Sequence, residues 1–254
     1  MIFFILLLIF SGYLFYKFFN NNSSDSSYSS STQQTLDRLR IESKDKLSAF
    51  LNDKPNIEFY IDERNVLIVD FETTGLPISR DAPISDIDNW PRIVSASLLL
   101  YTKNGKLIEE YYTLIKQLIA IPQEAVDIHK ISTEEANSSG ISFKEFSLKL
   151  QYFSDRSSVF CAHNIDFDYK VLQADLKRNK FKNYFSKHKK ICTKLKGRRV
   201  TGRNNKLLNL VEECYGATLL DNTLLHNASV DSRLTAACFF YMLDMEYIND
   251  DIFN

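Results

Sequence analysis

From residue 66 onwards, the chain alternates between short apolar runs and longer stretches with helical spacing. The run NVLIVDF is short and apolar, as a buried strand should be. The β-rich runs IVSASLLLYT and KLIEEYYTLI flank Asn104-Gly105, a dipeptide that predicts a β-hairpin. Further strands are predicted at SVFCAH and KKICTKL, and helices at SFKEFSLKLQYF, DYKVLQADLKRN, NKLLNLVEECYG and VDSRLTAACFFYMLDMEY. This order predicts an α/β domain with a mixed central sheet flanked by helices.

A separate apolar segment occupies residues 1–19, of which all but three are apolar. As a helix it would span about 28 Å, close to the hydrocarbon thickness of a bilayer. A cleaved signal peptide is one alternative, but the basic start and small-residue cleavage site are missing; a buried core helix is another. The nearest basic residues (Lys17, Arg38 and Arg40) lie at the end of the run or after it. We therefore predict a single-pass transmembrane anchor with the following domain on the cytoplasmic side.

Two segments connect this predicted anchor to the folded part of the chain. Residues 20–34 contain seven serines in fifteen positions, which predicts a flexible Ser/Asn-rich linker. Residues 35–63 begin with leucines near helical spacing and predict an amphipathic helix and a connector. The folded domain is predicted to span 64–247, with an acidic tail at 248–254.

Composition narrows the class of protein. The chain has 254 residues, 44% apolar and 25% charged, which excludes a wholly disordered chain, a collagen-like repeat and a multi-span membrane protein. Its net charge of −1 says nothing about partners. Seven glycines supply no Gly-rich phosphate loop, and four cysteines without a CxxC pair argue against a zinc knuckle or a thioredoxin-type site.

The first candidate site lies where the predicted strand NVLIVDF runs out into a loop. Asp70 and Glu72 in VDFETTG are two residues apart, so on a strand they point to the same face. They also lie at the carboxyl end of the strand, the edge at which open α/β sheets bind ligands. Neighbouring like charges are costly without a cation between them, and carboxylate oxygens suit Mg²⁺ or Mn²⁺. Alone, the pair also fits two solvated loop acids.

Two further clusters have ordinary explanations when each is taken alone. Asp166 and Asp168 in AHNIDFDYKVL fit acids in the first turn of a helix. Asp231 in LHNASVDSRL fits the same role in the last long helix. His226, just before that helix, fits a plain loop histidine.

Together, the three clusters resemble the motifs of the DEDDh 3′–5′ exonucleases, the DnaQ-like family related to the DNA polymerase III epsilon subunit. The matching motifs are VDFETTG, HNIDFD and HNASVD, which occur in the family's order. A further match is VDIHKIS, around His129. The resemblance covers residues 64–245 or so, and implies a ribonuclease-H-like fold.

The resemblance implies a two-metal phosphodiester hydrolase. Asp70, Glu72, Asp168 and Asp231 would hold two Mg²⁺ or Mn²⁺ ions, and His226 would be the general base. Substrate-binding roles would fall to Thr73, Thr74, Leu76, His129 and Asn164. The proline-marked loop 77–91 departs from the family pattern, either as a cover over the substrate groove or as a simple exposed loop.

A basic stretch independently favours a nucleic-acid substrate. Residues 177–206 hold thirteen of the 31 Lys and Arg residues and no acid, with aromatic residues interleaved. Phosphate neutralisation combined with aromatic stacking is typical of single-strand binding. Arg198 and Arg199 are the predicted phosphate contacts, and a solvated basic face is the alternative.

The sequence thus predicts a membrane-tethered exonuclease that acts on nucleic-acid 3′ ends, with single-stranded DNA as the expected substrate. An exoribonuclease or oligoribonuclease of the same fold is one alternative. A non-catalytic nucleic-acid-binding accessory module is another, disfavoured because all four acids and the histidine are present. A DNA polymerase or repair complex is an expected partner.

Overall fold

One mixed sheet organises the part of the chain that the structure describes, a computed structural model covering residues 42–56, 64–203, 206–216 and 227–253. Its five strands lie in the order β3-β2-β1-β4-β5. They are β1 (Val66–Thr73), β2 (Ile93–Tyr101), β3 (Leu107–Leu114), β4 (Val159–Ala162) and β5 (Lys189–Cys192). β1, β2 and β3 pair antiparallel, whereas β4 lies parallel to β1 and β5 parallel to β4. The predicted mixed α/β fold is confirmed.

The predicted hairpin joins β2 and β3. Leu98 pairs with Tyr111, and Tyr101 with Leu107. At the turn, Gly105 has a φ of 79°, a left-handed conformation that glycine adopts without steric cost. A Cβ there would also lie 3.4 Å from the ring of Phe240, so the turn approaches the last helix closely.

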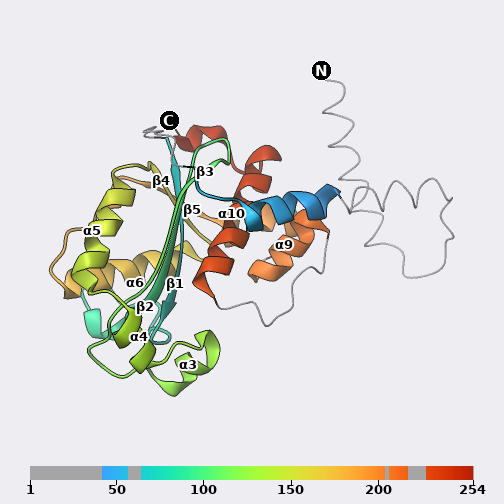
Figure 1. Cartoon of the computed structure of the whole chain (residues 1–254). Helices are drawn as coiled ribbons and strands as arrows, with labels where there is room; N and C mark the ends of the chain where they lie inside the picture. The colour runs from blue at the N-terminus through green and yellow to red at the C-terminus, as the bar shows by residue number, and fades with distance from the viewer. Residues whose placement is uncertain (1–41, 57–63, 204–205, 217–226, 254) are drawn as a thin grey trace, which may run out of the picture. The chain divides into compact units, whose positions relative to one another are not determined.

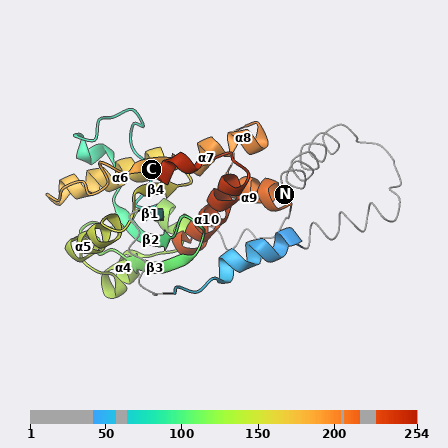
Figure 2. The same cartoon turned by 90° about the horizontal axis from the view of Figure 1, so that it is seen from above.

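Helices cover both faces of the sheet (Figures 1 and 2). α5 (Phe143–Ser154) and α6 (Ile165–Arg178) lie on one face. α9 (Leu207–Tyr215), α10 (Ala228–Asp244) and a helix at 42–52 lie on the other. Shorter helices complete the described elements: η1 (Ile87–Asn89), α3 (Gln123–His129), α4 (Thr133–Ser139), α7 (Thr193–Lys196), α8 (Arg198–Thr201) and η3 (Asp250–Phe253).

The alternation of side chains along β1 separates two apolar cores. Val66 and Ile68 point toward α9 and α10, where they join a cluster that includes Leu99 and Phe239. The residues between them point toward α5 and α6, among them Leu67. Because both faces are buried, β1 is apolar throughout its first four residues, as its sequence predicts.

The sequence pattern misplaced several boundaries. KKICTKL is not one strand: β5 ends at Cys192, and Thr193 begins the short helix α7. α6 begins at Ile165, before the predicted start, because Asn164 is already its N-cap. α3 and α4, seven residues each, were not predicted. They cover a third, small apolar cluster around Val94.

The predicted membrane localisation is contradicted. Within the described residues, no helix is both long enough and apolar enough to cross a bilayer. The longest described helix, α10, has 17 residues and packs its apolar side chains against the sheet. The segment predicted as an anchor, 1–19, lies outside the described residues, as does the predicted linker 20–34. We therefore withdraw the prediction of a single-pass protein that is tethered to the membrane.

The last described residues contribute to the core. Ile248, Ile252 and Phe253 are buried in the cluster beneath α9 and α10. The stretch predicted as an acidic tail therefore points its apolar side chains inward. The remaining predicted segment boundaries stay predictions.

Arg233 on α10 joins three elements. Its guanidinium pairs with Glu110 of β3, with Nη2 2.6 Å from the nearer carboxylate oxygen. Its Nη1 also donates to the backbone carbonyls of Phe50, Leu51 and Asp53 at 3.0–3.3 Å. These carbonyls lie at the C-terminal end of helix 42–52, where helix carbonyls lack intrahelical donors. One side chain therefore satisfies the end of this helix and fixes it to the sheet.

We expect Arg233→Met to lower the free energy of unfolding by about 2 kcal/mol, because it leaves Glu110 and three carbonyls without their charged donor. Urea denaturation measures the change. The double variant Arg233→Met/Glu110→Leu should lose less than the two single variants summed, since both partners of the pair are then gone. An Arg233→Met protein as stable as wild type would contradict this role.

Candidate active site

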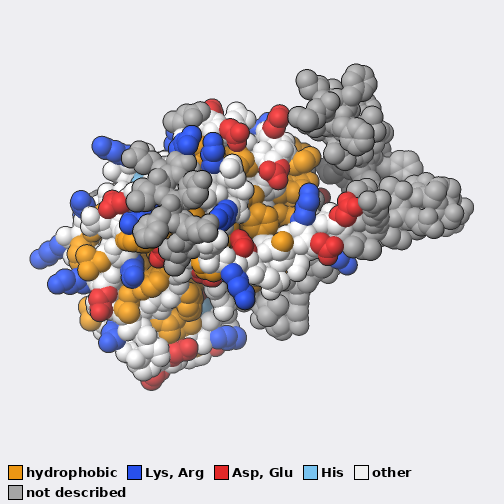
Figure 3. All heavy atoms as spheres, turned by 45° about the horizontal axis from the view of Figure 1, so that its top comes forward, with side chains coloured by type: hydrophobic (Ala, Val, Ile, Leu, Met, Phe, Trp, Pro, Cys, Tyr) orange, Lys and Arg blue, Asp and Glu red, His pale blue; other side chains and the backbone are white. Residues whose placement is uncertain are grey.

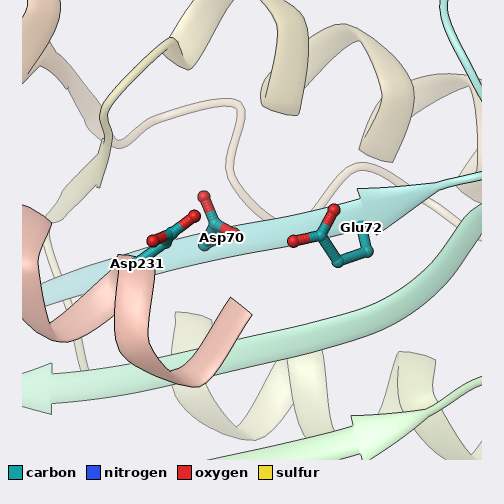
Figure 4. Close-up of side chains that lie close together, drawn as sticks. All are labelled: Asp70, Glu72 and Asp231. Carbon is teal, nitrogen blue, oxygen red and sulfur yellow. The ribbon is translucent and has the colours of Figure 1, made fainter. Parts of the chain in front are cut away.

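Three carboxylates converge at the carboxyl end of β1. Asp70 and Glu72 continue the face of β1 that Val66 and Ile68 begin, so both point toward α10. Asp231 comes from the first turn of α10. Figure 4 shows Asp231 and Glu72 directed toward Asp70 from either side. Each of the three residues offers one oxygen that lies within 4.8 Å of the others.

Two hydrogen bonds place Asp231. The side chain of Asn227, the N-cap of α10, accepts a hydrogen bond from Ser229 N at 3.0 Å, which fixes the start of the helix. One residue beyond Asp231, the hydroxyl of Ser232 lies 2.7 Å from that of Ser97 in the buried core. Ser97 pairs with Asp70 in the β1–β2 register. The start of α10 is therefore tied to the strand position beside Asp70.

Asp168 lies beside the three converging carboxylates. It belongs to the first turn of α6 and is only 5% exposed. A backbone hydrogen bond links it to Phe71 of β1, between Asp70 and Glu72. All four carboxylates line one pocket of about 430 Å³. The structure thus brings together the four acids that the sequence singled out.

Burial and like charge oppose ionisation of these acids. Burial, followed by repulsion from Asp168, Glu72 and Asp231, holds the pKa of Asp70 well above its usual range. Burial and the neighbouring Asp231 raise the pKa of Glu72 to about 7. Burial, together with Glu72, raises the pKa of Asp168 to about 7. Without a cation the cluster is electrostatically strained at neutral pH.

The chemistry of the cluster fits divalent cations. All its donors are carboxylate oxygens, the ligands that Mg²⁺ and Mn²⁺ prefer. Asp70, Glu72 and Asp231 are half-buried, so the cluster is enclosed by protein yet reached from the pocket. Burial and mutual repulsion raise the pKa values of Asp70, Glu72 and Asp168, and a bound cation would relieve the repulsion.

Of the predicted substrate-binding residues, some line the pocket and others build the turn beside it. Leu76, 74% exposed, and Asn164 line the pocket. Thr73 and Thr74 use their hydroxyls to build the turn after β1. Thr73 Oγ1 donates to the Gly75 carbonyl at 2.7 Å, and Thr74 Oγ1 accepts from Arg92 N at 3.0 Å. Both threonines therefore shape the turn that presents Leu76.

His129 is 7% exposed and lies at the end of α3. Its Nδ1 accepts from Ile131 N at 3.1 Å, whereas its buried Nε2 has no hydrogen-bond partner among the described residues. Burial lowers its pKa, so the neutral ring is favoured. His129 is not among the described residues that line the pocket.

Arg198 and Arg199, the predicted phosphate contacts, lie on α8 and are likewise absent from the described lining of the pocket. Arg199 donates to the Tyr247 carbonyl at 2.8 Å and lies over the Tyr247 ring. The basic stretch 177–206 extends over the end of α6, β5, α7 and α8. On the face shown in Figure 3, Lys and Arg side chains are dispersed among apolar and acidic ones. His226 lies outside the described residues.

Sequence reasoning missed much of the pocket wall. The sequence did not single out Phe71, His163, Phe167 and Leu207, which also line the pocket. Pro77, Arg80 and Trp90 line it from the loop 77–91, one of whose two sequence interpretations was a cover over the groove, and Asp166 lines it beside Asp168. His163 carried a signal, since it stands beside Asn164 in HNIDFD. Leu207 carried none, because it reaches the pocket only through the placement of α9.

Comparison with known proteins identifies the class. The chain matches the exonuclease family RNase_T over residues 67–239, more than half of its length, and it belongs to this family. The resemblance to DEDDh, DnaQ-like exonucleases of the ribonuclease-H-like superfamily is thereby confirmed. No curated protein matches the sequence.

Solved structures of exonuclease I share the fold. The enzyme from Methylocaldum szegediense is 18% identical with a TM-score of 0.57, and the match covers 75% of this chain and 42% of that one. A zinc-bound complex of the E. coli enzyme with single-stranded DNA is 17% identical with a TM-score of 0.56, covering 73% and 41%. A complex of the E. coli enzyme with a dA16 oligonucleotide is 17% identical with a TM-score of 0.55, and the match covers 74% of this chain and 42% of that one. The chain therefore spans about two fifths of these proteins.

The raised pKa values predict how the stability of the metal-free protein depends on pH. An unfolded Asp or Glu titrates near pH 4, whereas Glu72 and Asp168 titrate at about 7 when folded. Their protonation stabilises the fold fully below about pH 4, and this contribution is lost as the pH rises through 7. In EDTA, the free energy of unfolding should therefore fall between about pH 5 and 7.5, as urea denaturation would measure.

Two controls accompany this measurement. Asp168→Asn should flatten the pH dependence, because the amide does not ionise. When Mg²⁺ or Mn²⁺ is added to the wild-type protein at pH 7.5, its free energy of unfolding should rise again, because the cation binds the folded state. A free energy of unfolding that stays constant over this pH range would show that the carboxylates are not coupled in this way.

Proposed function

We propose that the protein is a 3′–5′ exonuclease that hydrolyses single-stranded DNA with two divalent cations. Membership of the exonuclease family supports phosphodiester hydrolysis. The exonuclease I structures with the same fold include complexes with dT13 and dA16 oligonucleotides, which supports single-stranded DNA as the substrate. The observation that carries the proposal is the convergence of Asp70, Glu72 and Asp231 beside buried Asp168 in one pocket.

In this proposal the four carboxylates hold the cations and the pocket holds the strand end. Bound divalent cations would supply Lewis-acid activation of water and neutralise the charge that develops during phosphodiester cleavage. Leu76 and Asn164, at the pocket surface, would contact the terminal nucleotide. Thr73 and Thr74 would act indirectly, by fixing the turn before Leu76.

We also propose His226 as the general base. It immediately precedes Asn227, the N-cap of α10, and it lies five positions before Asp231 in the sequence. An imidazole with an ordinary pKa near 6.5 can accept a proton from attacking water at neutral pH. A polymerase or repair complex as partner stays a prediction of the sequence.

The direct test uses the full-length chain to digest oligonucleotides that carry a label at the 5′ or the 3′ end. With Mg²⁺ or Mn²⁺, 5′-labelled single-stranded DNA should give a ladder of progressively shorter products, whereas 3′-labelled DNA should release labelled mononucleotide at once. EDTA should abolish both reactions. Faster digestion of RNA than of DNA would assign an exoribonuclease instead. Oligonucleotide binding without hydrolysis in either metal would favour a non-catalytic accessory module.

A pair of variants two residues apart tests the metal ligands. Asp168→Asn should abolish hydrolysis, because it removes a charged oxygen ligand from the buried cluster. The matched control is Asp166→Asn, because Asp166 is exposed and pairs with Lys170 at 3.0 Å. It should stay close to wild-type turnover. An active Asp168→Asn protein with an inactive Asp166→Asn protein would show that the second motif is aligned incorrectly.

His226→Ala should behave differently from the ligand variants. Turnover should fall by about 10²–10⁴-fold, the usual contribution of a positioned acid–base group, while metal and oligonucleotide binding persist. Raising the pH should restore part of the activity, because hydroxide then replaces the missing base. Full activity of His226→Ala at pH 7 would reject the general-base assignment. Calorimetric titration with Mn²⁺ checks that the metal still binds.

A further inference from the structure

The loop at 77–91 forms a wall of the pocket. Pro77, Arg80 and Trp90 all line it, together with the four carboxylates. The sequence left open whether this loop covers the substrate groove or is merely exposed. Its place in the pocket shows that it borders the groove.

Hydrogen bonds within the loop hold its ends together. Ser79 N donates to Asn89 Oδ1 at 2.7 Å, and Asn89 Nδ2 donates to the Ser79 carbonyl at 2.9 Å. Trp90 Nε1 donates to the Pro83 carbonyl at 3.3 Å. The backbone on either side of Arg80 is therefore built into a closed turn.

Charged groups of α6 fix the loop from outside. Arg178 donates to the carbonyls of Ile87 and Trp90, and it pairs with buried Asp175. Asp175 in turn accepts from Ile93 N at 2.7 Å. At the other end of the loop, Lys170 Nζ donates to the Arg80 carbonyl at 3.3 Å and lies 5.6 Å from the Trp90 ring centroid. The position of Arg80 relative to α6 is thus set before any substrate binds.

Arg80 is the one Arg or Lys among the described residues that line the pocket. Its side chain is exposed, and only its backbone carbonyl is engaged by Lys170. The pocket otherwise carries five acids, of which Asp166 already pairs with Lys170. Divalent cations at the four clustered carboxylates would offset those charges and the phosphate being cleaved. A protein cation beside a further phosphate of a polyanionic strand adds affinity, because it releases condensed counterions.

We propose that Arg80 binds the phosphate on the 5′ side of the scissile one, so that the 77–91 loop selects polynucleotide strands over isolated nucleotide esters. This inference rests on the proposed function. A guanidinium suits the role, because it stays charged and forms paired hydrogen bonds to phosphate oxygens. The fixed loop backbone lowers the ordering cost of that contact.

The test compares two substrates that differ in the upstream phosphate. One is a single-stranded DNA oligonucleotide; the other is the nitrophenyl ester of thymidine 5′-monophosphate, which has no phosphate upstream of the cleaved bond. Arg80→Gln should raise KM for the oligonucleotide about tenfold, as for the loss of one charged hydrogen bond, with kcat unchanged. The slope of log KM against log salt should flatten by about one. Hydrolysis of the ester should remain as in wild type.

Arg156→Gln is the matched control, because Arg156 lies beyond the end of α5 and outside the described lining of the pocket. Its guanidinium donates to the local carbonyl of Tyr152 and lies 3.7 Å from the centroid of the Tyr152 ring. It should leave both substrates unaffected. Unchanged oligonucleotide KM and salt slope in Arg80→Gln, or an equal loss on the ester, would overturn the role of Arg80. Failure of the wild-type protein to hydrolyse either substrate would instead refute the proposed function, and this inference with it.

Discussion

The crowding of four partly or fully buried carboxylates into one pocket is the constraint on which the site depends. Four acids that would separate in solution are held in one pocket, where burial makes their charged forms costly and mutual repulsion adds to that cost. Apolar packing on both faces of β1 and the contact between Ser97 and Ser232 hold them there. The fold therefore stores an unfavourable interaction that a cation can relieve. Relief of this repulsion contributes to the affinity of the site for a metal ion, in addition to the geometry of the ligands.

Much of the architecture could be predicted because its signals are local. The apolar run of β1, the Asn104-Gly105 turn and the periodicity of α5 each specify an element within about a dozen residues. α3 and α4 escaped prediction because seven residues make only two helical turns, too few to show a period. The end of β5 escaped because a β-compatible stretch continues into α7.

The acids of the site could be predicted from their motifs, but the pocket around them could not. Trp90 and Leu207 are separated by more than a hundred residues and reach the same pocket only through tertiary packing. The sequence predicted phosphate contacts in the dense basic stretch at 177–206, but it gave no such signal for Arg80, which lies in a loop with other charges. Counting charges along a sequence does not show which of them face a pocket. His129 is the opposite case: it belongs to a matching motif, yet it is buried and lies outside the described lining of the pocket.

The residues that match the family begin at 67 and end at 239, yet the packing does not stop there. Phe50 stacks on Phe240 with ring centroids 5.7 Å apart, and Leu47 is buried in the same core. Phe253 enters that core from the other end of the chain. The segment that matches the family is thus smaller than the unit that packs into this core. A fragment trimmed to the family boundaries would lack Phe240 and the end of α10, and it would expose Tyr101 of β2, against which Phe50 and Phe240 pack. Such newly exposed apolar surface favours self-association.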